Sequence, residues 1–442
     1  MANANDDLHG IGRAPKPARI VMATFEYGVF RLGGLATAVT ALCGELDRSL
    51  YQPVVVLPRC GVSVPWRSIA SRSYEKFAVE IFDHDGTEVW LLSNSIFDDS
   101  IYSAFAEVAG PNGRFPKVDA YGLALAELLP DLDASVLHLH DSFGWRALPV
   151  ARDRHVPSVL TVHCLHAELD CVVEAERNAV ERVDVVATVS ESYRLEHESF
   201  FGLARKTVIV PNGADPSYWS AETAPGGTTA AARAGRLSNL LARHSMSIAP
   251  TFAYIGRLDR HQKGVDVLIA AYHRLVASHL IDFNLLIFGD GVPEMREELL
   301  AMAPRDDGHF CCSINFLSAA EVRTILGAVD FVIIPSRFEP FGLIQLEALG
   351  MGSVVIASRT GGLQEVMIDI ADEGGFGKLV TPGDDAELAD AMLEFSRLKL
   401  SSSGRLEELR TRGRARASEF TARATAAKYE NVYSDIMRGE PY

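Results

Sequence analysis

The chain has few cysteines and no long apolar segment. It holds 6 cysteines in 442 residues, and no two of them form a Cys-x-x-Cys pair. A disulfide framework therefore does not organise a chain of this length. No apolar run approaches the roughly 20 residues that a membrane-spanning helix needs. The absence of both features favours a protein held together by ordinary hydrophobic cores, in a reducing compartment.

Positive charge is also scarce. Lys and Arg total 42 against 58 Asp and Glu, which gives a formal net charge of −16. An acidic surface repels phosphate backbones, which argues against general nucleic-acid binding, although a local basic pocket for a small anion remains compatible with it. Residues 1–17 are polar and lack the apolar segment of a signal peptide. We expect a disordered tail over residues 1–18 and a cytoplasmic protein without a membrane span.

Short apolar runs alternate with helix-period stretches along most of the chain, and the alternation occurs twice. Fully apolar strands between helices favour parallel sheets covered on both faces. We predict one α/β domain over residues 19–219, a linker over 220–250 where Ala, Gly and Thr dominate, and a second α/β domain over 251–419. Strands are predicted at 19–24, 53–57, 76–82, 89–92, 136–139, 158–162, 185–189 and 207–210, then at 252–255, 284–288, 313–316, 331–334, 354–357 and 377–380. Helices are predicted at 34–47, 120–129, 145–152, 169–181, 237–243, 265–277, 294–302, 320–328, 343–349 and 386–398, with two more within 405–437.

Two cations stand in one predicted strand-to-helix connection of the second domain. Arg257 and Lys263 lie in the stretch 256–264, which reads GRLDRHQKG. Cations at the carboxyl edge of a sheet suit a diphosphate leaving group, because negative charge builds on it as its bond to the sugar breaks. An exposed loop with basic residues by chance is the alternative, and the local sequence does not decide between them.

Two glutamates follow the next informative strand. Glu339 lies in a turn beside Pro340, and Glu347 lies in the helix predicted to begin near Gly342. Such carboxylates accept hydrogen bonds from vicinal hydroxyls, and the helix amino terminus offers free N–H groups to a phosphate. A glutamate that merely caps its helix is the structural alternative.

Glycine pairs mark two further strand-to-helix turns. In the first domain, Arg31 precedes Gly33 and Gly34, and in the second domain Gly361 and Gly362 follow a strand. Bare backbone at such turns lets an anion approach closely. Neither domain has the Gly-x-Gly-x-x-Gly fingerprint of dinucleotide-binding domains.

Taken together, these segments resemble the glycogen and starch synthase family of retaining glycosyltransferases. The family pattern Lys-x-Gly-Gly-Leu corresponds here to Arg31 through Leu35, and the matches run in family order from about residue 20 to 435. The resemblance implies the GT-B fold, in which two Rossmann-like doubly wound domains face each other across a cleft. It also implies that residues 420–442 form a helix that crosses back to the first domain. The matching segments are His138-Leu139-His140-Asp141, Thr161-Val162-His163, Thr188-Val189-Ser190, Asn212-Gly213-Ala214-Asp215, Gly256 through Gly264, Glu339 through Glu347, Thr360-Gly361-Gly362-Leu363, and Phe420 with Tyr429 and Tyr433.

The resemblance also implies a role for each matching residue. His163, Arg257, Lys263 and Glu339 would form the catalytic set, with the two cations on the donor diphosphate, Glu339 on the sugar hydroxyls and the His163 carbonyl near the anomeric carbon. The donor would further contact Arg31, Gly33, Gly34, Glu347, Gly361, Gly362 and Leu363, with Glu347 on the ribose. Asp141 and Asn212 would lie near the sugar and the acceptor.

No metal or other cofactor is expected, because Arg257 and Lys263 would neutralise the diphosphate. Two weaker metal hypotheses are a DxD-like Asp83-His84-Asp85 and a zinc pair at His138 and His140. The sequence departs from the family at several positions: Arg31 replaces Lys, Ser142 replaces Trp, Cys164 replaces Asn, and the stretch 105–119 on the acceptor side differs.

These observations predict a nucleotide-sugar-dependent hexosyltransferase, with glucosyl favoured, that retains anomeric configuration and leaves its diphosphate to take the acceptor proton. The acceptor is a glucan or a small molecule. The alternatives are a pseudo-glycosyltransferase that couples a cyclitol, a nucleotide-sugar epimerase on the same fold, and a binding protein without catalysis. The oligomeric state and the donor base stay open.

Overall fold

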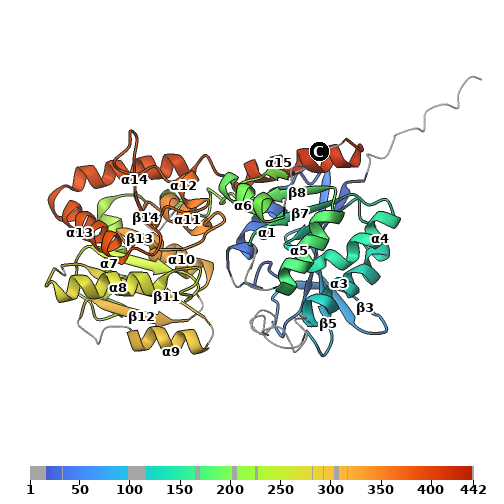
Figure 1. Cartoon of the computed structure of the whole chain (residues 1–442), viewed down its shortest axis with the longest axis horizontal. Coiled ribbons are helices and arrows are strands. Elements are labelled where there is room, and N and C mark those ends of the chain that lie inside the picture. The colour runs from blue at the N-terminus through green and yellow to red at the C-terminus, as the bar shows by residue number, and fades with distance from the viewer. Residues whose placement is uncertain are drawn as a thin grey trace, which may run out of the picture.

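The computed structural model of the protein describes residues 16–31, 33–97, 116–164, 170–201, 207–223, 227–280, 282–291, 293–302, 308–315 and 317–440. Most of the predicted tail, residues 1–15, and most of the divergent stretch 105–119 lie outside these ranges. The described chain forms two α/β domains side by side, with the last helix lying on the first domain (Figure 1).

The first domain is built on one sheet of nine described strands, in the order β3-β4-β5-β2-β1-β6-β7-β8-β9. Strand β4 runs antiparallel to β3 and β5, whereas the other neighbours pair in parallel. The strands are β1 (Ala18–Ala23), β2 (Tyr51–Pro58), β3 (Arg67–Ser73), β4 (Ala78–His84), β5 (Thr87–Ser93), β6 (Val136–His140), β7 (Ser158–Val162), β8 (Val185–Thr188) and β9 (Thr207–Ile209). The helices are α1 (Gly34–Glu45), α3 (Pro116–Leu128), α4 (Leu148–Asp153), α5 (Asp170–Arg182) and α6 (Glu191–Phe201), with short 3-10 turns η1 (Leu129–Asp131) and η2 (Ser142–Ala147).

The second domain has a smaller, wholly parallel sheet of six described strands, in the order β12-β11-β10-β13-β14-β15. The strands are β10 (Thr251–Ile255), β11 (Asn284–Gly289), β12 (Phe310–Ile314), β13 (Phe331–Ile334), β14 (Val354–Ser358) and β15 (Lys378–Val380). The helical elements are η3 (Ala221–Thr223), α7 (Ala230–Arg243), α8 (Val265–Ala277), α9 (Pro293–Met302), α10 (Ala319–Leu326), α11 (Leu343–Gly350), α12 (Leu363–Val366), α13 (Asp385–Ser401) and α14 (Ser403–Ala417), followed by α15 (Ala422–Met437), which returns to the first domain.

Both faces of each sheet are covered, as the apolar strands predict. Successive residues of a strand point to opposite faces. In β1, Val21 packs in the same cluster as residues of α3 and α5, whereas Met22 packs with residues of α1 and α15. In β10, Phe252 packs with α8 and α13, and Ala253 faces the side of α10 and α11. The predicted GT-B architecture of two doubly wound domains is therefore confirmed.

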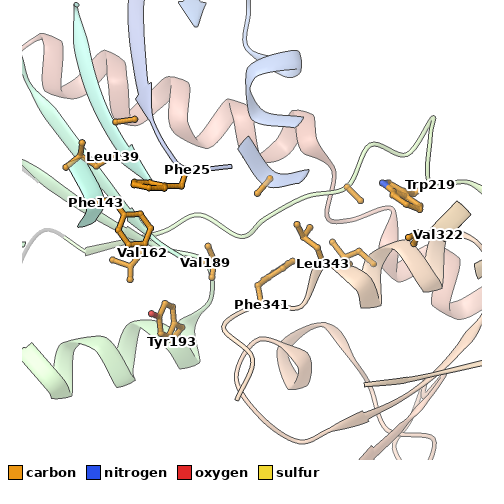
Figure 2. Packing of buried hydrophobic residues seen from close by; sticks show 14 of the residues in the cluster. Phe25, Leu139, Phe143, Val162, Val189, Tyr193, Trp219, Val322, Phe341 and Leu343 are labelled. Atoms are coloured by element: carbon orange, nitrogen blue, oxygen red, sulfur yellow. The ribbon is translucent and has the colours of Figure 1, made fainter. Parts of the chain in front are cut away.

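One apolar cluster continues from the first domain into the second (Figure 2). Val162, Val189 and Tyr193 belong to the first domain, and Phe341 and Leu343 belong to the second. All five side chains are buried. The two domains therefore share a packed contact beside the edges of their sheets.

The chain passes between the domains twice, and the two passages lie side by side. The Ala214 N–H donates to the Phe420 carbonyl at 3.0 Å, and the Ala422 N–H donates to the Ala214 carbonyl at 3.0 Å. After this point α15 packs on the first domain, where the Tyr433 hydroxyl meets His138 Nδ1 at 2.7 Å. The predicted C-terminal crossover helix is thus present.

Three of the elements that differ from the sequence prediction show what the sequence signal lacks. Strand β3 was not predicted, because all seven of its residues are exposed and it carries no apolar alternation. Helix α6 was also not predicted, because its residues are mostly polar. Helix α7 begins at Ala230, within the stretch 220–250 for which we expected a linker, whereas a helix was predicted only over 237–243. Its alanines favour helix, the Thr229 side chain caps it by accepting from the Ala232 N–H, and its Arg233 donates to the Met351 carbonyl at 3.2 Å.

We expect the Gly213→Ala variant to destabilise the protein by about 1–3 kcal/mol, the usual range for overpacking. A Cβ atom at Gly213 would lie 2.2 Å from backbone atoms of Thr421, so the paired passages would have to separate. Urea unfolding followed by circular dichroism measures the change. Gly44→Ala in α1 is the matched control, because a Cβ there meets nothing within 4 Å and should be neutral or stabilising. Equal behaviour of the two variants would contradict the close approach.

Candidate active site

The predicted functional residues lie in loops that leave parallel strands at their carboxyl ends, where α/β proteins bind ligands. The loops after β1, β6 and β7 carry Arg31, Asp141 and His163, and the loops after β10, β13 and β14 carry Arg257, Lys263, Glu339, Gly361 and Gly362.

Lys263 and Glu339 form an ion pair although they follow different strands. Lys263 Nζ lies 2.7 Å from Glu339 Oε2, and Ser336 Oγ donates to the same oxygen at 3.1 Å. The Glu339 side chain is 10% exposed and that of Lys263 is 23% exposed, so the pair is largely shielded from water. The pair places a cation and a buried carboxylate together at the edge of the sheet.

Arg257 lies on the same loop as Lys263 and is held by its neighbours. Its Nη2 atom lies 3.0 Å from Asp259 Oδ2 and also bonds the Gln262 side-chain oxygen. The amide of Gln262 contacts the first domain, with Nε2 3.8 Å from Cys164 Sγ, and the region around this contact between the two sets of loops is called the crevice below. The loop that carries both cations thus contacts the loop that carries His163.

Cys164 marks the place where the two halves of the site converge. Burial raises the pKa of its thiol to about 12, and the negative charge of Asp141 adds to this. Lys263 and Arg257 oppose the increase, and Glu339 contributes to it. Charges from both domains therefore act on one side chain, which places four predicted site residues near Cys164.

The Gly361–Leu363 loop folds directly onto Glu339. The Gly362 N–H donates to the Glu339 carbonyl at 3.0 Å. A Cβ at Gly361 would lie 2.0 Å from that carbonyl oxygen, and Gly361 has φ +46°. Only glycine fits there, and it holds the turn that carries Glu339 in place.

The amino termini of α1 and α11 meet across the crevice. A Cβ on Gly34 would lie 3.6 Å from Leu343 Cδ1. Both helices begin after a glycine, Gly33 and Gly342, and neither has a side-chain cap from that residue. First-turn N–H groups have no partner within their helix and carry partial positive charge. Two helix amino termini, one from each domain, therefore lie together at the crevice.

The Glu26 carboxylate binds N–H groups at the positive amino terminus of α1. This buried carboxylate accepts from the Gly33 N–H at 2.9 Å and from the Ala36 N–H at 3.3 Å. Gly33, which the resemblance assigns to the donor, is thus engaged within its own domain. The sequence analysis missed Glu26, although its place just after β1 follows the same strand-end rule as the other residues.

Arg31 and Glu347 lie close enough to interact across the crevice. Burial raises the pKa of the Glu347 carboxyl to about 7, and the charge of Arg31 partly opposes the increase. The Arg31 guanidinium also donates to Thr37 Oγ1 at 2.8 Å. Glu347 is therefore a carboxyl group that changes its charge near neutral pH.

His163 is fixed through both its backbone and its ring. Asp141, a non-glycine residue with φ +59°, accepts the His163 N–H at 2.7 Å and the Cys164 N–H at 3.3 Å through Oδ1. The His163 ring meets His140, with Nε2 and Nδ1 3.0 Å apart. Burial raises the pKa of Asp141 to about 8 and lowers that of His163 to about 3. The ring of His163 is thus uncharged at neutral pH and is held by its contact with His140.

A chain of buried polar groups continues from this pair to the crossover helix. His138 bonds the Tyr433 hydroxyl and Thr161 Oγ1, each at 2.7 Å, and Thr161 bonds the Tyr429 hydroxyl at 2.7 Å. Burial lowers the pKa of His138 to about 3 and that of His140 well below its usual value. The hydrogen bonds of His138 thus hold the crossover helix α15 against the sheet of the first domain.

The other residues singled out in the sequence lie as follows. Asn212 is buried where the chain leaves the first domain. Asp83-His84-Asp85 spans the turn between β4 and β5, where His84 stacks on Trp66. Across the part of the chain that the structure describes, no three His, Cys, Asp or Glu side chains gather as metal ligands would. In the same residues, no helix combines the length and the apolar character that a membrane crossing requires.

Comparison with known proteins agrees with this arrangement. The family described as "Glycosyltransferase Family 4" matches residues 32–218, and the family described as "Glycosyl transferases group 1" matches residues 249–397. The glycogen synthase of Mycobacterium tuberculosis H37Rv is 28% identical to this chain, with 96% of each chain covered.

Solved structures show the same fold. The catalytic domain of starch synthase IV from Arabidopsis thaliana, bound to ADP and acarbose, superposes with a TM-score of 0.78 at 20% identity, covering 96% of this chain and 100% of that chain. Sucrose-phosphate synthase from Thermosynechococcus elongatus superposes with a TM-score of 0.70 at 20% identity, with the same coverage of 96% and 100%.

The fold and the family matches define the chain as a GT-B glycosyltransferase, which confirms the predicted enzyme class of nucleotide-sugar-dependent glycosyltransferases. Within that class, the chain is similar to glycogen synthases in sequence and to a starch synthase in fold, as the motifs indicate.

The His138 environment predicts a specific acid sensitivity. The pKa of His138 is about 3 in the folded protein, against about 6.5 when exposed, so between these values the unfolded chain binds the extra proton. This contribution to stability is present above pH 6.5 and is lost as the pH falls toward 3, by about 1.4 kcal/mol per pH unit. Urea unfolding at pH 6, 5 and 4 should show a smaller loss for His138→Gln than for the wild type. His273→Gln, at an exposed position of α8, serves as control. Parallel pH curves for wild type and His138→Gln would contradict the prediction.

Proposed function

We propose that this enzyme transfers a hexosyl group, with glucosyl favoured, from a nucleoside diphosphate sugar to an acceptor hydroxyl with retention of configuration. The observation that carries the proposal is the crevice, in which two positive helix ends and the Lys263 and Arg257 side chains converge beside the buried Glu339. A diphosphate is the ligand that such a site suits, because several donors and cations can share its charge. The ADP and acarbose bound to the starch synthase neighbour support a nucleoside diphosphate and a glucan-like acceptor here.

The proposed reaction exchanges one bond at the anomeric carbon. The bond to the donor diphosphate breaks while a bond to the acceptor oxygen forms on the same face, and the acceptor proton passes to the departing diphosphate. Lys263 and Arg257 stabilise the charge that develops on that group, which is the largest electrostatic contribution that the site offers. Glu339 holds the sugar hydroxyls, and Asp141 fixes the backbone of His163 beneath the sugar. We propose that no metal ion takes part, because the two cations supply the neutralising charge.

The acceptor is either an α-glucan or a small molecule. The glycogen synthase relatives support the glucan. Cys164 and Ser142 stand where the family has Asn and Trp, and both lie next to predicted site residues, Cys164 beside His163 and Ser142 beside Asp141. These replacements on the acceptor side favour the small-molecule alternative, so both acceptor classes belong in the assay.

A donor and acceptor panel tests the proposal directly. Purified enzyme is incubated with ADP-, UDP- and GDP-glucose, each with glycogen, maltooligosaccharides or a panel of small polyols, in the presence of EDTA. We expect nucleoside diphosphate release with at least one pair and an α-linked product by NMR. Donor consumption without acceptor, with an epimer as product, would indicate the epimerase instead. Tight donor binding without turnover would indicate a binding protein.

In the same assay we expect Lys263→Ala to lower kcat roughly a hundredfold, in line with the loss of one group that stabilises transition-state charge. Lys263→Arg should retain more activity, because it keeps the charge while changing its geometry. Lys428→Ala, at an exposed position of α15, is the matched control and should act as wild type. Unchanged turnover in Lys263→Ala would remove this residue from the site.

Donor binding should depend on pH through Glu347. The pKa of its carboxyl is about 7 in the donor-free protein, and accepting hydrogen bonds from ribose hydroxyls favours the ionised form. The donor diphosphate keeps its charge over this range, so binding should be about tenfold tighter at pH 8 than at pH 6, with proton release below pH 7. Isothermal titration calorimetry in two buffers measures both quantities. Glu347→Gln should flatten the profile, and a variant that keeps the wild-type slope would assign the titration to another group.

A further inference from the structure

A glutamate of the second domain caps a helix of the first. The Glu365 carboxylate of α12 accepts the Glu191 N–H at 3.0 Å through Oε2 and the Ser192 N–H at 2.6 Å through Oε1. Both donors lie in the first turn of α6, where N–H groups have no partner within the helix. The negative charge also lies at the positive end of the α6 dipole. The amino terminus of α6 is therefore completed by the other domain.

The same end of α6 contacts the loop that carries Glu339. The buried hydroxyl of Ser190 accepts the Tyr193 N–H at 3.1 Å and donates to the Pro340 carbonyl at 2.6 Å. The Tyr193 ring lies edge-on to Phe338, with ring centroids 5.8 Å apart. Figure 2 shows Tyr193 beneath the strand ends of the first domain, facing the loop of Phe341. One helix end of the first domain thus contacts both α12 and the turn around Glu339.

Helix α12 is itself held from two sides. Its first residue belongs to the Gly361–Leu363 loop, which is fastened to Glu339 through the Gly362 N–H. At its other end, Arg416 donates to the carbonyls of Glu365 at 2.8 Å and Val366 at 3.1 Å. The Arg416 guanidinium stacks on Phe420, 4.8 Å from the ring centroid, where the chain crosses between the domains. Glu365 thus lies in a short helix that hydrogen bonds hold at both ends.

The position of α6 is linked to that of His163 through two neighbouring strands. Helix α6 follows β8, and β8 pairs in parallel with β7, whose last residue is Val162. A contact that fixes α6 against the second domain also fixes the edge of the first sheet from which His163 projects. The donor loops and His163 must stand at a set separation for a one-step exchange, because misplacement by about 1 Å can cost a hundredfold in rate.

We propose that Glu365 is a positioning residue for glycosyl transfer, whose carboxylate holds the His163 edge of the first domain against the donor loops of the second. The inference rests on the proposed function and adds a residue that touches neither donor nor acceptor. Two charge-assisted hydrogen bonds are strong enough to shift an open-to-closed equilibrium by one to two orders of magnitude.

The test compares Glu365→Ala and Glu365→Gln with Glu373→Gln, an exposed glutamate of the same domain that changes net charge equally. Spin labels on the exposed faces of the two domains report their separation by pulsed electron resonance, without any donor. We expect Glu365→Ala to broaden the distance distribution and lower kcat tenfold to a hundredfold, while the donor Kd changes less than threefold. Glu365→Gln, which keeps one acceptor oxygen, should lie between, and Glu373→Gln should match wild type.

Unchanged distances together with unchanged kcat in Glu365→Ala would overturn the proposal, and so would a loss of donor affinity as large as the loss of kcat. Should Glu365→Ala fail to fold, Ser190→Ala removes the neighbouring hydrogen bond from the same end of α6 to the Pro340 carbonyl, and an unchanged distance distribution in both Ser190→Ala and Glu365→Gln would also overturn it. If wild type turns over no donor but Glu365→Ala still widens the distances, then the proposed function fails while the interdomain contact stands. The two failures are therefore distinguishable.

Discussion

Lys263 and Glu339 meet at 2.7 Å because two strands of one parallel sheet end at the same edge. The cation of Lys263 stabilises Glu339 in its buried position, since a buried carboxylate without a cation is costly. The pair fixes the turn around Glu339, and onto that turn fold the Gly361–Leu363 loop, the start of α11 and the first-domain residue Ser190. Contacts from both domains therefore meet at the turn that this ion pair holds.

The crevice combines two kinds of positive charge with carboxyl groups that are partly neutral. The helix ends and the side chains of Arg257 and Lys263 attract an anion, whereas burial raises the pKa of Asp141 to about 8 and of Glu347 to about 7. A diphosphate therefore meets less negative charge than the residue count suggests. The neutral histidines beneath the site keep His163 in one orientation without adding charge. This balance explains how a chain with a net charge of −16 can present a site for a phosphorylated ligand.

Much of the architecture could be predicted from the sequence because buried parallel strands leave a strong signal. Strand β7 and helix α8 have the predicted ends, since their apolar runs stop at clear turn residues. Strand β3 could not be predicted, because an exposed edge strand needs no apolar alternation. Only the second half of helix α7 was predicted, because the glycine and threonine next to the alanines at its start are typical of a linker.

The residues of the candidate site also divide into those that the sequence predicts and those that it does not. Their positions after the ends of parallel strands, together with the motifs, predict Lys263, Glu339 and Asp141 as site residues. The structure places all three near Cys164. Glu365 leaves no such signal, because its partners are backbone groups of a helix 174 positions away in the sequence. Contacts between domains depend on the relative orientation of the two folded domains, and no local sequence pattern encodes this orientation. This is why the capping of α6 emerges only from the structure.

The most direct measurement of the central claim is a crystal structure of the enzyme with a nucleoside diphosphate bound. The account predicts the two phosphates beside the amino termini of α1 and α11, with Lys263 Nζ and the Arg257 guanidinium within hydrogen-bond distance of their oxygens. A diphosphate bound outside this crevice, or in it but with both cations turned away, would contradict the account.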